Sequence, residues 1–89
     1  MGDNIFTKLG YKLIEHEDTK WRYEKETRYG IFSLTIRTDI REISANMIPS
    51  LLIVYESHIE GYANAFKDMM KDAKRIAEYS GYRLINEVK

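Results

Sequence analysis

The spacing of apolar residues changes near residue 57, and this change constrains the fold more than any other feature of the chain. Before it, apolar residues alternate with polar ones, as in Phe32, Leu34 and Ile36, which is typical of strands with one buried face. After it, they recur every three or four residues, the spacing that lines one side of an α-helix. These residues are Ile59, Tyr62, Phe66, Met69, Ala73 and Ile76. The sequence therefore predicts a small sheet followed by one long amphipathic helix.

The region before residue 57 is expected to contain one short helix and several strands. Asp3 or Asn4 can cap a helix over residues 5–9, whose Phe6 and Leu9 would face the core, and Gly10 would end it. Turn-forming residues then separate four predicted strands, at residues 11–17, 20–27, 31–38 and 41–48. Pro49 marks a sheet edge or a break.

Residues 51–56 fit two structures. Their apolar, β-rich composition favours a buried strand, and Ser57 and Glu60 then form a capping box for a helix from about residue 58 to residue 80. The alternative is a single helix that begins at Ser50. Gly81 would end the helix, and residues 82–85 would return as an extended tail. Charged residues, including an Asp72–Arg75 pair, are expected on the solvated side of the helix.

These elements predict an α+β fold in which residues 1–89 form a single domain. It would comprise a short N-terminal helix, a small antiparallel sheet of three to five strands, and one long C-terminal amphipathic helix packed on the sheet. The chain has no cysteine, shows no secretory signal, and has no apolar run long enough to cross a membrane. We expect a cytoplasmic protein with no membrane partner.

Charge is balanced along the chain, with 14 basic and 14 acidic side chains. Residues 1–49 carry eight of each sign and residues 50–89 carry six of each. Because phosphate neutralisation needs a basic excess, this balance argues against nucleic acid as a partner. A net charge near zero also leaves little repulsion between copies, so self-association is compatible with the sequence.

Residues suited to catalysis or metal binding do not form a recognisable pattern. His16 and His58 are the only histidines, and their surroundings match no metal motif. The serines lack a nucleophile-elbow context, and there is no glycine-rich phosphate loop. Carboxylates gather on the first two predicted strands, where neighbouring lysines and arginines would neutralise them. We therefore expect no enzymatic activity, no catalytic residue, and no metal or other cofactor.

Aromatic residues offer two candidate surfaces. Trp21, Tyr23 and Lys25 share a strand face and, with Arg37, could form an aromatic and basic surface that stacks single-stranded nucleic acid. The competing expectation is that Trp21 and Tyr23 pack under the long helix as core residues. The candidate protein interface consists of Tyr55, Tyr62, Phe66, Met69, Met70 and Tyr79. The apolar side of the helix could also join two copies in a homodimer, although packing within one chain is the default.

Three short segments, Phe6-x-x-Leu9-Gly10-Tyr11, Tyr23-x-Lys25-Glu26 and Ile31-Phe32, resemble the opening of small uncharacterised proteins of phages and prophages of Gram-positive bacteria. The resemblance covers roughly residues 1–40 and the Gly81-Tyr82 pair near the chain end, and residues 41–55 depart from it. It implies a short helix, a small meander and a C-terminal helix, and it carries over no functional residues.

The leading functional hypothesis is a non-enzymatic, protein-binding accessory protein of the phage type, such as a host-interaction or inhibitor protein, which acts by surface contact. The alternatives are a weak single-stranded nucleic-acid binder and a structural homodimer.

Overall fold

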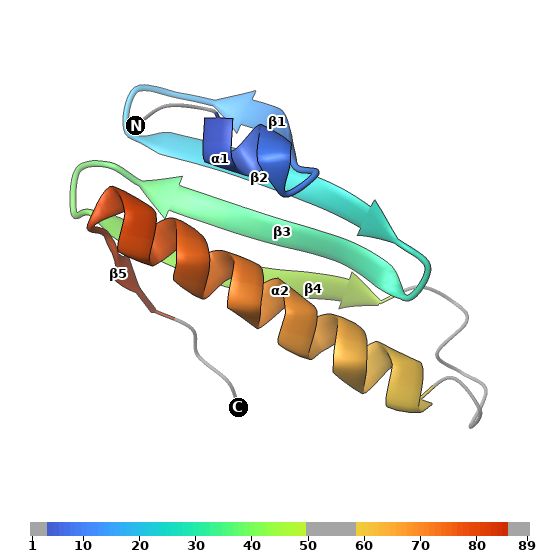
Figure 1. The fold of residues 1–89 in the computed structure, drawn as a ribbon. Helices are drawn as coiled ribbons and strands as arrows, with labels where there is room; N and C mark the ends of the chain where they lie inside the picture. The colour runs from blue at the N-terminus through green and yellow to red at the C-terminus, as the bar shows by residue number, and fades with distance from the viewer. Residues whose placement is uncertain (1–3, 50–58, 86–89) are drawn as a thin grey trace.

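The computed structural model describes residues 4–49 and 59–85, which form a five-stranded sheet with two helices on the same face (Figure 1). The elements are α1 (Asn4–Lys8), β1 (Lys12–His16), β2 (Lys20–Thr27), β3 (Gly30–Arg37), β4 (Glu42–Pro49), α2 (Ile59–Ser80) and β5 (Arg83–Leu84). The predicted short helix, sheet and long C-terminal helix are confirmed. Residues 51–56, which the sequence predicts as a strand or as part of the helix, lie outside the described residues. They include Tyr55 of the candidate protein interface.

Strand order follows chain order, β1-β2-β3-β4-β5, so the first four strands form an antiparallel meander. The fifth strand runs parallel to β4, so the five-stranded sheet is mostly antiparallel. Its backbone N–H groups at Arg83 and Ile85 donate to the carbonyl oxygens of Arg41 and Ile43, at 2.9 and 2.8 Å. The extended tail predicted for residues 82–85 therefore adds a strand to the sheet. A two-residue strand has no periodicity from which this pairing could be predicted.

The strand register places the apolar residues of the meander on one face. Tyr23 lies opposite Leu34, and Leu34 lies opposite Ala45, so these three side chains form a row beneath the helices. The other face is mainly polar, although Ile31 and Ile48 lie opposite each other there. There Arg22 pairs with Glu15 of β1 at 3.5 Å, as expected for a carboxylate neutralised across strands, and with Glu24 of its own strand at 3.7 Å. The sheet therefore has one core face and one open face, with the alternation that the sequence predicts.

The long helix covers the centre of the sheet with the residues that its spacing selects. Met69, Ala73 and Ile76 are completely buried against β3 and β4. Near the start of α2, Gly61 lies against the ring of Tyr29, and a Cβ at this position would overlap that ring. Glycine costs about 1 kcal/mol relative to alanine inside a helix. Here it makes room for a side chain of the β2–β3 turn.

The edge strand β1 is irregular. Its pairing with β2 shifts between Leu13 and Glu15, so that Ile14 is the extra residue of a β-bulge. Leu13 lies opposite Tyr23 and is therefore on the helix face, whereas Glu15 lies opposite Arg22 on the open face. The bulge thus changes which residues of β1 share a face.

Candidate functional site

The first helix is fixed to the sheet by one aromatic pair. Phe6 is fully buried, and its ring stacks on that of Tyr23 with centroids 3.7 Å apart and planes nearly parallel. Tyr23 is in turn only 2% exposed. A ring covered in this way cannot stack on a nucleic-acid base. Tyr23 thus packs in the core, beneath α1 rather than beneath the long helix.

The remaining residues of the candidate nucleic-acid surface do not share one face. Trp21 lies opposite Ile36 on the helix face, is half-buried, and meets the His16 ring edge-on at a centroid distance of 4.1 Å. Arg37 follows Ile36 and therefore projects from the open face, where it pairs with Asp39 at 3.1 Å. Trp21, Tyr23 and Lys25 thus share the helix face, as predicted, but Tyr23 is covered there and Arg37 lies on the open face.

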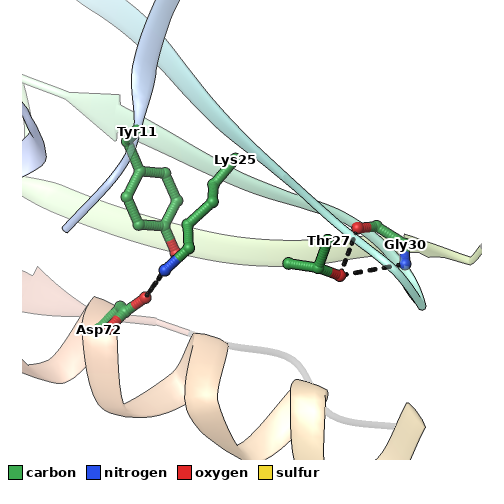
Figure 2. A network of polar contacts seen from close by, with 5 residues as sticks. All are labelled: Tyr11, Lys25, Thr27, Gly30 and Asp72. Carbon is green, nitrogen blue, oxygen red and sulfur yellow. Dashed lines mark hydrogen bonds and ion pairs between the residues drawn. The ribbon is translucent and has the colours of Figure 1, made fainter. Parts of the chain in front are cut away.

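A polar cluster of Tyr11, Lys25 and Asp72 joins the sheet to the long helix (Figure 2). The Tyr11 hydroxyl donates to Asp72 Oδ2 at 3.0 Å, and the Lys25 ammonium lies 3.4 Å from the same oxygen. The sequence predicts Asp72 on the solvated side of α2, paired with Arg75. Asp72 is instead only partly exposed and lies on the side of α2 that faces the sheet. The correction follows from tertiary contact, because Lys25 of β2 and Tyr11, the residue before β1, present a cation and a hydroxyl to this turn of the helix.

The Tyr11 hydroxyl is held in its protonated form. Burial raises its pKa well above the ordinary value of 10.0, and the charge of Asp72 and the hydrogen bond to it act in the same direction. A phenol with so high a pKa is a poor general acid or base at neutral pH. The cluster is therefore suited to fixing α2 against β2, and the arrangement does not favour proton transfer.

The cluster predicts a loss of stability in alkali. Because the pKa of Tyr11 is raised in the folded state, its contribution is fully present below pH 10.0, the unfolded value, and is lost as pH rises above it. We expect the urea midpoint to fall between about pH 8 and about pH 11. The fall should be smaller in Tyr11→Phe, which has no ionisable group there. Equal falls in the two proteins would contradict the assignment.

The same close-up view shows how the β2–β3 turn is closed (Figure 2). Thr27 Oγ1 donates to the carbonyl oxygen of Gly30 at 2.7 Å and accepts from the Gly30 N–H at 3.2 Å. This double contact fixes the turn that carries Tyr29 towards α2.

A groove that combines apolar and charged side chains lies between α1 and the last turns of α2. Its volume is about 620 Å³, and its described lining is Ile5, Thr7, Lys8, Leu9, Arg75 and Tyr79. Ile5 and Leu9 are half-buried, and Tyr79 is 64% exposed at the groove. Lys8 and Arg75 supply two positive charges, and no carboxylate is among the described lining residues. The groove is therefore apolar at its base and cationic at its rim.

The residues of the predicted protein interface are placed very differently from one another. Met69 is completely buried against the sheet, and Tyr62, Phe66 and Met70 are half-buried at the border of the core. Tyr79 alone among its described members is largely exposed. A homodimer through the helix would have to use these border residues, because the sheet of the same chain already covers the centre of the apolar side.

The sequence did not single out the other residues of the groove. Arg75 and Tyr79 are four residues apart, so helical spacing places them on one side of α2 and could have suggested half of the surface. The other half comes from α1, whose position depends on the stacking of Phe6 on Tyr23.

Other classes of site leave no trace in the part of the chain that the structure describes. No group of three or more His, Asp or Glu side chains is arranged there to hold a metal ion. Neither described helix combines the length and the apolar composition that a membrane crossing requires. Comparison of the chain with protein-family models, with curated proteins and with solved structures gave no match. Its function has to be inferred from its own surface.

Proposed function

We propose that this protein is a non-enzymatic binding module and that it holds an acidic, partly apolar segment of a partner protein in the groove between α1 and α2. The observation that carries the proposal is the exposed ring of Tyr79 beside two cations and two aliphatic side chains. Tyrosines and arginines are the residue types that most often dominate binding energy at protein interfaces.

Charge defines the chemistry of the partner. Lys8 and Arg75 rim the groove without a carboxylate among its described lining residues, although the whole chain has no net charge. Acidic side chains of a partner would meet these two cations, and an aliphatic or aromatic residue between them would contact Ile5, Leu9 and Tyr79. The hypothesis of an accessory role of the phage type stays a prediction.

Selection from a library of random displayed peptides tests this proposal. We expect the immobilised protein to enrich peptides that carry Asp or Glu beside Leu, Ile or Phe. Binding of a selected peptide, followed by fluorescence anisotropy, should weaken at least about tenfold in Tyr79→Ser and in Arg75→Glu, which each remove about 1.4 kcal/mol or more. It should also weaken as salt concentration rises.

Lys74→Glu is the matched control, because Lys74 is exposed on the same helix and does not line the groove. It makes the same change of charge as Arg75→Glu and should leave peptide binding unchanged. The proposal is wrong if the library yields no acidic peptides, or if Lys74→Glu weakens binding as much as Arg75→Glu does.

A further inference from the structure

Arg75, at the rim of the groove, differs from the other arginines of this chain. Each of the others either pairs with a carboxylate or lies over an aromatic ring. Arg22, Arg37 and Arg83 pair with carboxylates, and Arg28 and Arg41 lie over rings. Within the described residues Arg75 has neither kind of partner, and its side chain is exposed at the groove. The groove therefore presents a guanidinium that no described carboxylate of this chain binds.

The surroundings of Arg75 define what a ligand must carry. Lys8 lines the same groove and likewise makes no ion pair with a described residue. Ile5 and Leu9 are four residues apart on α1, so helical spacing places these two aliphatic side chains on one side of it. Two unpaired cations thus border an apolar surface. A matching ligand has a carboxylate and an apolar group close to each other.

The length of the groove limits how such a ligand can be built. The wall supplied by α1 is five residues long, about 7.5 Å at the rise of an α-helix. Successive side chains of an extended peptide point to opposite sides, so two that face the groove together are about 6.6 Å apart along the chain. An internal carboxylate and an internal apolar side chain would therefore need nearly the whole wall. The last residue of a chain carries both groups on one Cα atom.

We infer that the segment held in the groove is the C-terminus of a partner protein that ends in an aliphatic or aromatic residue. This inference rests on the proposed function and narrows it. The terminal carboxylate accepts from the guanidinium of Arg75, whose parallel N–H groups match the two carboxylate oxygens, and Lys8 adds a second positive charge. The last side chain contacts Ile5 and Leu9, and the exposed ring of Tyr79 packs against it. Acidic residues earlier in the segment add to the attraction.

Two displayed libraries distinguish a chain end from an internal segment. One carries its random residues at a free C-terminus, and the other carries them between constant flanks. We expect the immobilised protein to enrich the first library in sequences that end in Leu, Ile, Val or Phe. Enrichment of flanked acidic peptides alone overturns this inference and leaves the proposed function standing. Enrichment of neither library overturns both.

A single pair of peptides tests the carboxylate directly. The peptide selected from the first library is synthesised once with a free C-terminal carboxylate and once as the C-terminal amide, each with a fluorescent label at its N-terminus. Fluorescence anisotropy should show at least about tenfold weaker binding of the amide, because it has no charge and cannot accept both hydrogen bonds of a bidentate pair. Equal affinities of the two peptides overturn the inference.

Arg75→Gln tests which side chain recognises the carboxylate. Glutamine keeps a polar side chain but supplies no charge, so the preference for the carboxylate over the amide should fall at least about threefold. Lys74→Gln is the matched control, because Lys74 is exposed on the same helix and is not among the lining residues. It should keep the preference of the wild-type protein.

Both peptides are measured on the same variant, so a general loss of stability does not change their ratio. If Lys74→Gln reduces the preference as much as Arg75→Gln does, the peptides respond to overall charge and the assignment to Arg75 is wrong. An unchanged preference in Arg75→Gln contradicts the assignment as well.

Discussion

Phe6→Ala should lower the free energy of unfolding by about 3 kcal/mol or more, the usual loss when a buried phenylalanine is truncated. Phe6 is fully buried and stacks on Tyr23, so the change removes the contact that holds α1 on the sheet. A helix of five residues has no stability of its own, and α1 should come away from the sheet when this contact is lost. Urea denaturation followed by circular dichroism measures the loss.

The same variant has a second readout. One wall of the groove belongs to α1, so peptides selected on the wild-type protein should no longer bind to Phe6→Ala even where it remains folded. Phe6→Leu is the control, because it keeps an apolar side chain of similar reach and should cost less than about 1.5 kcal/mol. A loss below about 1 kcal/mol in Phe6→Ala would contradict the docking of α1.

Gly30→Ala should destabilise the protein by about 2–3 kcal/mol, the cost of forcing an atom into a closely packed site. Gly30 begins β3 opposite Pro49, and a Cβ at this position would overlap the backbone carbonyl oxygen of Ile48. Backbone cannot rotate away as a side chain can, so β3 and β4 would have to separate at this end. Thermal and urea unfolding measure the effect.

Gly81→Ala separates this steric effect from the conformational effect of replacing glycine. Gly81 ends α2 with a positive φ of 74°, but no atom lies within 4 Å of a Cβ built there. It should cost only about 1 kcal/mol, the penalty of the left-handed region for alanine. If the two variants lose equal stability, the contact between Gly30 and Ile48 is not what requires glycine.

The regular elements could be predicted from the sequence because their signals are periodic. Spacing of three and four residues identified α2 and its buried Met69, Ala73 and Ile76, and alternation identified the buried face of β3. These signals are local, because each one reports the solvent exposure of a single element. They carry no information about which element lies beside which.

Features that depend on tertiary position were accordingly missed. Asp72 and Tyr11 are 61 residues apart in the chain, and nothing in the pattern of α2 distinguishes Asp72 from its solvated neighbours. The groove has the same origin, because Lys8 and Arg75 meet only once Phe6 has docked. Tyr79 was selected as an interface residue for its type alone, and its position beside α1 could not be derived from the sequence.

The strand order has a consequence for the way a ribosome produces this protein. The four strands of the meander pair with neighbours in the sequence, so they can assemble as soon as residues 12–49 are available. The part of their apolar face that α2 covers, however, stays exposed until synthesis has reached the end of α2 at Ser80. During that interval the nascent chain presents Phe32, Leu34 and Ile36 to its surroundings, which is the situation in which chaperones engage growing polypeptides.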